Sequence, residues 1–455
     1  MNQPPIPPAY NPSVAIPETH PRGFMFFFWG EFAERSSFYG MRAILPIYLT
    51  TALHLADTEA APIYYWFKMA CYFLPLVGGF LADRFFGRYW TIVGFSIPYI
   101  AGHFILGIEN QTACYIALAL LACGSGVIKP NISSLLGQTY DEQRPGNDRL
   151  RQAAFLWFYF AINFGALISQ IAMPLLQETH GFAVAFQFPA WLMAGSFLIF
   201  ASGKRHYAVE TINRAPVTPE ERREQWRTLR QLFSIFGLMV FFWIAYEHND
   251  SLWVYFTRDY VNLYIPFREE PLPPAMIQFI NALFVLLLIP FFNWLFPRLD
   301  RDRKIFTPTR KMLMGFIATA LATGIMSLAG YLGTQSEAKI SLTWPVTAYI
   351  VLTVGEVLLY GTGLDLAYSL APKKMKGFVT ACFLLTNTIG NFVNSFFSQL
   401  YGGSLTDPVE KRGPLSPGDF FGITTLLVVF AAVAFYFVGR RFDRERAKAA
   451  EVTPV

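Results

Sequence analysis

Two glutamates and one arginine lie within five residues of each other in an otherwise apolar segment near the start of the chain. Glu31, Glu34 and Arg35 interrupt a stretch built of Phe, Trp, Ala, Leu and Ile. On a helix, Glu31 and Arg35 are i,i+4 neighbours, and Glu34 lies close to the same face. A lone charge at bilayer depth costs roughly 2.5–3.5 kcal/mol, so such charges usually pair and serve a pathway. The spacing therefore predicts a polar face inside a membrane transporter.

The composition agrees with a membrane location. The 455 residues are 54% hydrophobic and only 15% charged, whereas soluble domains carry about 25% charged residues. Apolar runs of about 18–25 residues match the length that a helix needs to cross roughly 30 Å of hydrocarbon. We predict an all-α membrane protein with twelve transmembrane helices. The predicted spans are 24–50, 62–82, 89–108, 113–137, 153–175, 183–203, 231–256, 274–297, 310–332, 343–370, 377–401 and 418–440.

The distribution of Lys and Arg predicts the orientation of these spans. One set of loops holds five basic residues, namely Arg258, Arg268, Lys339, Lys411 and Arg412, and most of the 36 lie on the other side. Cytoplasmic loops carry the excess of positive charge, so both termini are expected in the cytoplasm. The net charge of +5 is then an insertion signal, and no nucleic-acid partner is expected.

The longest polar segment between spans divides them six and six. We predict two six-helix bundles, as expected for a transporter built from two repeats related by an axis along the membrane normal. The predicted parts are an N-terminal tail at 1–22, a bundle at 23–203, a cytoplasmic loop at 204–230, a bundle at 231–440 and a C-terminal tail at 441–455.

The turn after the second span, residues 79–88, reads Gly-Phe-Leu-Ala-Asp-Arg-Phe-Phe-Gly-Arg. Gly87 permits a tight turn, and Asp83 can pair with a neighbouring arginine or cap a helix. The pattern resembles the loop motif of the major facilitator superfamily. The resemblance implies that Asp83, Arg84 and Arg88 help to latch the two bundles on the cytoplasmic side.

More specific motifs follow one another along the whole chain. They are Glu-x-x-Glu-Arg-x-x-Phe-Tyr-Gly at 31–40, Gly-Ser-Gly-Val-Ile-Lys-Pro-Asn at 124–131, Phe-Tyr-Phe-Ala-Ile-Asn-Phe-Gly at 158–165, Phe-Trp-Ile-Ala-Tyr-Glu at 242–247, Gln-Phe-Ile-Asn at 278–281, Gly-Glu at 355–356 and Thr-Gly-Leu-Asp-Leu-Ala-Tyr-Ser at 362–369. Together they resemble the proton-dependent oligopeptide transporter family of the major facilitator superfamily. The resemblance implies a symporter of the plasma (bacterial inner) membrane that imports di- and tripeptides with protons. It also implies no enzymatic activity, no cofactor beyond the proton gradient, and function as a monomer in the lipid bilayer.

The resemblance further implies a peptide site between the bundles. Arg35 with Lys129 would hold the peptide carboxylate, and Glu356 would receive the α-amino group. The other implied substrate-binding residues are Tyr39, Tyr72, Tyr159, Asn163, Trp243, Gln278, Asn281, Tyr360, Ser369 and Phe383. Independent chemistry agrees, because a zwitterionic peptide needs a cationic and an anionic end to its pocket, roughly 7–10 Å apart. Arginine also presents a two-pronged donor to a carboxylate.

Proton coupling and gating are implied for an overlapping set of residues. The proton-coupling residues are Glu31, Glu34, Arg35, Lys129 and Glu247. Arg42 and Lys129 are expected to pair with Glu247 across the bundles and close the outer gate. Protonating one partner of such a pair frees the other charge for substrate, which couples the two movements. Lys68 is expected to snorkel or to meet a polar neighbour, and it is assigned no function.

Several alternatives stay open. Either Glu31 or Glu34 could serve only to neutralise Arg35. Tyr360 stands where the family usually has a small residue, and Asp365 stands where its motif usually has Glu. These departures keep open a transporter of the same fold for nitrate, an amino acid or a drug-like molecule. A peptide sensor that does not transport is a further alternative. An embedded hydrolase is not favoured, because no paired metal ligands lie at i,i+4 within a span.

Overall fold

The computed structural model describes residues 19–209, 218–266, 268–299, 306–370 and 376–452, and nearly all of them are helical. The first half contains α1 (Gly23–Thr51), α2 (Asp57–Leu81), the π-helical turn η1 (Ala82–Phe86), α3 (Arg88–Leu106), α4 (Gln111–Gln143), α5 (Asp148–Ser202) and η2 (Lys204–His206). The second half begins with α6 (Pro219–Tyr246), η3 (Glu247–Asp250), α7 (Leu252–Tyr260), η4 (Pro274–Gln278), α8 (Phe279–Leu299) and α9 (Pro308–Gln335). It continues with α10 (Thr343–Glu356), η5 (Val357–Gly361), α11 (Thr362–Leu370), α12 (Lys376–Phe397), η7 (Ser398–Leu400), η8 (Val409–Lys411) and α13 (Pro417–Val452). Strands β1 (Val261–Asn262) and β2 (Ile340–Ser341) pair in parallel.

Each of the twelve predicted spans lies on a helical segment of the described chain. By length and composition alone, nine helices among the described residues can cross a membrane. One of these is α5, which is two helices joined at Gly181, where φ is +80°. The other long helices, α1 and α12, are more polar: α1 carries four charged residues and α12 carries a row of asparagines. Their polar faces are therefore the places where a pathway is expected.

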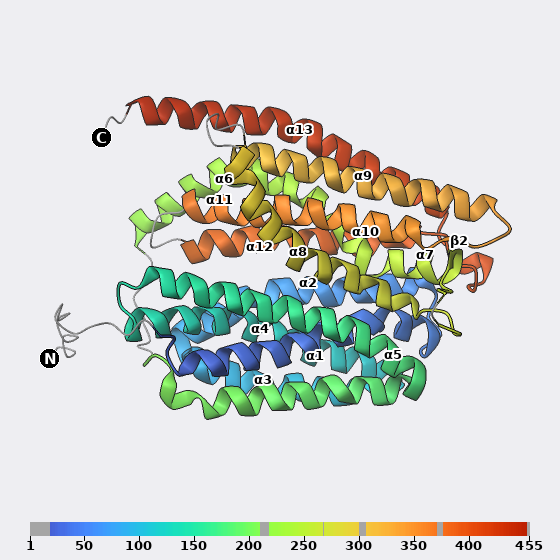
Figure 1. Cartoon of the computed structure of the whole chain (residues 1–455), viewed down its shortest axis with the longest axis horizontal. Coiled ribbons are helices and arrows are strands. Elements are labelled where there is room, and N and C mark those ends of the chain that lie inside the picture. Colours follow the sequence, from blue (N-terminus) through green and yellow to red (C-terminus); the bar gives the residue numbers. More distant parts are fainter. Residues whose placement is uncertain (1–18, 210–217, 267, 300–305, 371–375, 453–455) are drawn as a thin grey trace.

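The helices before residue 203 and those after residue 219 occupy opposite sides of the molecule in Figure 1. Within the first set, α1 packs along α5 and α3 packs along α4. Within the second set, α9 lies between α10 and α13. The two sets meet where α2 contacts α12 and where α5 contacts α8. The first and last described residues lie at the same end of the molecule. We call this the terminal end, and the opposite end, with α7 and the strands, the loop end.

Two helices run further than the apolar segments predict. The polar loop predicted at 204–230 includes the first turns of α6, which begins at Pro219. The predicted tail at 441–455 includes the last turns of α13, which runs to Val452. Both extensions are rich in Glu, Arg, Lys, Gln or Ala. These residues have high helix propensity, so a helix continues beyond the apolar run that marks the membrane.

Local departures from α-helical geometry fall next to several of the predicted site residues. Gly87 adopts a φ of +74° between η1 and α3, which is the tight turn that its position predicts. The π-helical turn η5 follows Glu356 directly, and η3 begins at Glu247. Non-α turns inside long helices often occur at functional sites. Both breaks reposition the backbone beside a carboxylate in the second half of the molecule.

Candidate functional site

The three charged residues of the first motif form one buried cluster on α1. Arg35 Nε lies 2.9 Å from Glu31 Oε1 and also pairs with Glu34. The three residues expose 3% or less of their surface. The Nη1 and Nη2 atoms of Arg35 have no hydrogen-bond partner among the described residues. A buried guanidinium with two unmatched nitrogens is suited to bind a pair of anionic oxygens.

Lys129 lies beside this cluster, on the neighbouring helix α4. Its positive charge attracts the carboxylates of Glu31 and Glu34 and repels the guanidinium of Arg35. Its ammonium lies 5.1 Å from the centroid of the Tyr72 ring. The side chain is exposed although it belongs to a central helix. The fold thus brings together the two cations that the sequence assigns to one anionic group.

A second set of buried charges joins α1 and α2 to η3. Lys68 pairs with both Glu247 and Asp250, and Arg42 Nη2 lies 3.1 Å from Asp250 Oδ1. Asn387 donates a hydrogen bond of 2.7 Å to Glu247 Oε1. We call Arg42, Lys68, Glu247 and Asp250 the inter-half ion cluster. It holds two cations from the first half against two carboxylates from the second.

The predicted gate pairs of Arg42 and Lys129 with Glu247 are therefore wrong. Glu247 pairs with Lys68 of α2, to which the sequence assigns no function, and Arg42 pairs with Asp250 instead. Lys129 lies beside the α1 cluster. The sequence spacing could have identified Asp250, because this residue follows Glu247 by three positions and so shares its helical face. Another is the expectation that a lone Lys68 at bilayer depth must find a carboxylate.

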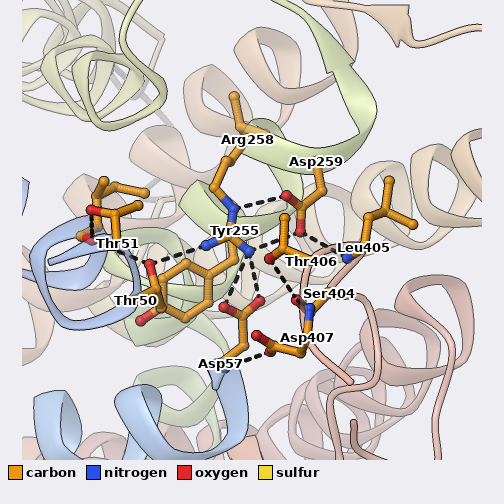
Figure 2. A network of polar contacts seen from close by, with 12 residues as sticks. Thr50, Thr51, Asp57, Tyr255, Arg258, Asp259, Ser404, Leu405, Thr406 and Asp407 are labelled. Carbon is orange, nitrogen blue, oxygen red and sulfur yellow. Dashed lines mark hydrogen bonds and ion pairs between the residues drawn. The ribbon is translucent and has the colours of Figure 1, made fainter. Parts of the chain in front are cut away.

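A third set of polar contacts closes the loop end of the molecule around Arg258 of α7 (Figure 2). Its Nη2 lies 3.0 Å from Asp57 Oδ2 at the start of α2, and its Nη1 donates a 3.1 Å hydrogen bond to Thr50 of α1. Its Nε lies 2.8 Å from the neighbouring Asp259. The Asp57 N–H in turn donates to Asp407 in the loop before α13, at 2.8 Å. We call this the loop-end network.

The neighbouring carboxylates stabilise the protonated, charged form of Arg258. Burial alone would lower the pKa of Arg258, but the hydrogen bond to Asp259 and the charges of Asp57 and Asp259 raise it above its usual value. The guanidinium therefore stays charged throughout the physiological pH range. The loop-end network, like the inter-half ion cluster, ties the first half of the molecule to the second.

A cavity of about 390 Å³ lies on the side of the terminal end and is lined mainly by residues of the second half. Tyr159 of α5 lines it from one half, and Glu356 and Tyr360 line it from the other. It continues to Lys311 near the start of α9 and to Asp365 of α11. Asn281 donates a 2.7 Å hydrogen bond to Glu356 Oε2. The ion pairs close one end of the interface, and the cavity lies toward the other.

Three predicted aromatic residues form one wall beside this cavity. The rings of Trp243 and Tyr360 meet edge to face at 5.4 Å, and Phe383 lies 5.8 Å from Tyr360. Trp243 Nε1 donates a 3.0 Å hydrogen bond to Thr386 Oγ1. Phe383 is fully buried. Tyr360 therefore separates the cavity from a packed aromatic cluster.

The remaining predicted substrate-binding residues make other contacts. Gln278 is buried and donates a 3.0 Å hydrogen bond to the Ala43 carbonyl of α1, so it joins the two halves. Tyr39 lies under the guanidinium of Arg42, at 4.8 Å. Asn163 donates to the Tyr159 carbonyl one turn earlier, at 3.0 Å.

The remaining predicted positions bear less directly on the site. Ser369 is on α11, but its side chain falls outside the described residues. Asp83, which is predicted to help latch the bundles, accepts a 2.7 Å hydrogen bond from Arg88 within the same turn. Arg84 lies beside them in η1. The sequence predicts this local pairing of Asp83 with a neighbouring arginine.

The helices, the buried charges between them and the cavity define an all-α membrane protein with a transporter fold. A family model described as the POT family matches residues 89–222 and 209–406. The chain therefore belongs to the POT family, and it is an integral membrane protein.

Curated relatives agree with this assignment. Solute carrier family 15 member 2 of Rattus norvegicus is 28% identical over 382 residues, which are 72% of this chain and 51% of that protein. Peptide transporter 3 of Caenorhabditis elegans is 30% identical over 359 residues, covering 68% of this chain and 50% of that protein. An uncharacterized transporter of Bacillus subtilis (strain 168), YclF, is 26% identical and covers 84% of this chain and 88% of its own. The chain thus spans about half the length of the first two relatives.

Solved structures cover nearly the whole chain. The POT family transporter PepTSo is 29% identical, with a TM-score of 0.82 over 94% of this chain and 99% of its own. An auto-inhibited POT family peptide transporter is 27% identical, with a TM-score of 0.81 over 93% of this chain and 97% of its own. These likenesses extend the family assignment from the matched residues to the complete helical architecture.

Proposed function

We propose that this protein imports di- and tripeptides together with protons by alternating access. In this proposal, two bundles at 23–203 and 231–440 rock around a central site. The observation that carries it is Arg35, a buried guanidinium of the first half whose terminal nitrogens are unmatched among the described residues. In the second half, Glu356 supplies a carboxylate to the wall of a cavity. The relatives include peptide transporters, which supports the same substrate class.

The two ends of the site carry opposite charges, as a zwitterionic peptide requires. Arg35 and Lys129 would bind the peptide carboxylate from the first half. Glu356, oriented by the hydrogen bond from Asn281, would accept the α-amino group from the second half. Tyr360 lies beside Glu356 in the cavity wall and would limit the first side chain of the peptide. The cationic end of the site belongs to the first half and the anionic end to the second. A peptide bound to both ends would therefore draw the two halves together.

Proton coupling would act through competition for Arg35. With Glu31 and Glu34 ionised, both carboxylates hold the guanidinium. A proton on either of them weakens its hold, so the guanidinium becomes available to a peptide carboxylate. One proton moving down about 100 mV supplies roughly 2.3 kcal/mol. At about 1.4 kcal/mol per tenfold, this corresponds to roughly 50-fold accumulation of a neutral solute.

The outer gate would consist of the inter-half ion cluster and the loop-end network. Both join the halves at one end, so both must separate before that end can open. The distribution of basic residues favours a cytoplasmic terminal end. We place the protein in the plasma (bacterial inner) membrane, acting as a monomer with the proton gradient as its energy source. Asp83, Arg84 and Arg88 would contribute to closing the cytoplasmic side.

The test is uptake of labelled dialanine into proteoliposomes that contain the purified chain, with and without an inward proton gradient. We expect gradient-driven accumulation that Glu34→Gln and Lys129→Ala abolish. Counterflow of labelled dialanine without a gradient separates transport from binding. Folded protein that shows neither uptake nor counterflow of several dipeptides would overturn the proposal.

A further inference from the structure

Helices α9 and α13 pack against each other along the outer edge of the second half (Figure 1). An apolar groove is lined by side chains of both helices. Its volume is about 750 Å³. Its walls include Leu321 and Leu328 of α9 and Val433 of α13, each of which is at least half exposed. Gly324 adds no side chain at its floor. The groove therefore faces the lipid and is shaped by side chains of both helices.

The residues that line this groove recur in the sequence with the periodicity of a helix. On α9, the lining residues Leu313, Ile317, Leu321, Gly324 and Leu328 follow one another at intervals of three or four. This spacing places them on a single face. Leu313 and Leu328 are 15 residue steps apart, or roughly 22 Å at 1.5 Å per step. One leaflet supplies about 15 Å of hydrocarbon. The groove is thus long enough for an acyl chain that enters from the leaflet on the side of the terminal end.

Toward the terminal end, the faces of α9 and α13 that line the groove carry arginines. A polar pocket of about 520 Å³ is lined by Arg310 at the start of α9 and by Arg440 and Arg444 near the end of α13. Leu313 and Tyr436 line both the pocket and the groove, so the two are continuous. The antiparallel direction of the helices is what brings the basic residues to one end. The combined site is therefore apolar along its length and cationic where it reaches the membrane surface.

The described residues that line the pocket carry a net positive charge. Of the described residues that line it, one, Asp443, is acidic. Its carboxylate accepts hydrogen bonds from Thr309, at 2.7 Å, and from Thr307, at 3.3 Å. Arg440 donates a 2.8 Å hydrogen bond to Tyr436, which holds its guanidinium at the mouth of the groove. The described lining thus contains three guanidinium groups and one carboxylate. That carboxylate already accepts hydrogen bonds from two hydroxyl groups.

We propose that this groove and pocket bind a phospholipid with an anionic headgroup from the leaflet on the side of the terminal end. Arginine forms two parallel hydrogen bonds with phosphate oxygens. Basic pockets between membrane helices at the cytoplasmic side suit anionic headgroups. The acyl chain would lie along the α9 face, and the headgroup phosphate would meet Arg440 and Arg444. A zwitterionic lipid fits the groove equally well but gains less from the pocket.

A second copy of the chain is a poorer occupant. If two copies met through this groove about an axis along the membrane normal, the arginines of both would lie at the same depth and close together. Like charges in that arrangement repel. An anionic lipid removes the repulsion instead of adding to it. The inference is independent of the transport activity proposed above, because it rests only on α9 and α13.

The experiment is a native mass-spectrometry titration of the full chain in detergent. The probes are phosphatidylglycerol and phosphatidylcholine with identical acyl chains. We expect one phosphatidylglycerol to bind about tenfold or more tightly than phosphatidylcholine. The double variant Arg440→Gln/Arg444→Gln should lose that preference, roughly a 10- to 30-fold change at about 1 kcal/mol per basic residue. Arg298→Gln, at the same end of the molecule on α8, is the matched control and should keep it.

A second pair of variants tests the groove itself. Leu321→Trp fills it and should weaken binding of both lipids. Leu287→Trp, at an equally exposed apolar position on α8, should not. Equal affinity for both lipids, or an unchanged preference in the arginine double variant, would overturn the proposal. So would a dimer mass in place of lipid-bound monomer. Glycerol 3-phosphate that binds as tightly as the lipid would identify a phosphate pocket instead.

Discussion

The α1 cluster and the inter-half ion cluster are both buried sets of opposite charges, but they differ in what they connect. Glu31, Glu34 and Arg35 all belong to one helix, so their contacts persist whatever the arrangement of the two halves. The inter-half ion cluster takes its cations from α1 and α2 and its carboxylates from η3, so it exists only while one end is closed. The first arrangement suits a site that exchanges protons and substrate. The second suits a gate.

The largest effect should come from Arg35→Gln. It leaves Glu31 and Glu34 buried without their cation, and breaking a buried pair typically costs about 3–5 kcal/mol. We expect loss of dialanine uptake together with a lower thermal unfolding temperature. Arg35→Lys keeps the charge but not the two-pronged donor, so it should restore stability more than uptake. Full uptake in Arg35→Gln would exclude the role proposed for this cluster.

The gate should respond to Asp250→Asn in a different way. The change removes the carboxylate that Arg42 and Lys68 share, so the closed state of the loop end loses stability. Ser251→Cys, at a fully buried position in the closed state, reports on opening in a background without the four native cysteines. A loss of about 1.4 kcal/mol would raise labelling by a membrane-impermeant thiol reagent about tenfold. Labelling that stays the same would show that this cluster does not hold the gate.

The cavity should be sensitive to the size of Tyr360. Tyr360→Ser removes the ring that separates the cavity from Trp243 and Phe383. We expect the KM for dipeptides with a bulky first side chain to fall several-fold, while the KM for dialanine changes little. Tyr360→Phe keeps the ring and serves as the control. Equal effects on large and small dipeptides would argue against a role in selecting side chains.

The smallest effect should come from Asp83→Asn. The Asp83–Arg88 pair is within one turn, and the Asp83 side chain is 60% exposed. Exposed ion pairs contribute roughly 0.2–1 kcal/mol. We expect a nearly unchanged unfolding temperature and, if these residues latch the cytoplasmic side, a modest change in uptake rate. A collapse of stability would indicate that the turn carries contacts beyond this pair.

The helical architecture could be predicted because its physical cause is local. Each span needs a long apolar run, and such a run is visible in the sequence without knowledge of its neighbours. The start of α6 at Pro219 was missed because a charged helix outside the membrane leaves no apolar signal. The α1 cluster was also predictable, since Glu31, Glu34 and Arg35 are close in sequence and must be close in space.

The partners within the inter-half ion cluster could not be assigned correctly from the same information. Which carboxylate faces Lys68 depends on the register of α2 against η3, and that register is set by packing between distant segments. The 3₁₀ turn of η3 brings Asp250 next to Glu247 in the inter-half ion cluster. Motif resemblance supplied Glu247 and Arg42 as members of the proposed gate but not their partners. The loop-end network was missed for the same reason, because Asp57, Arg258 and Asp407 come from three distant segments.

The π-helical turn after Glu356 has a consequence for insertions and deletions in this family. Such a turn holds one more residue than an α-helical turn, and each residue of an α-helix advances the face by about 100°. Deleting one residue from Val357–Gly361 would restore a regular helix and rotate everything after it by that angle. Asp365 would then leave the cavity wall that it shares with Glu356. The length of this short segment, and not only its side chains, therefore determines which groups a substrate can meet.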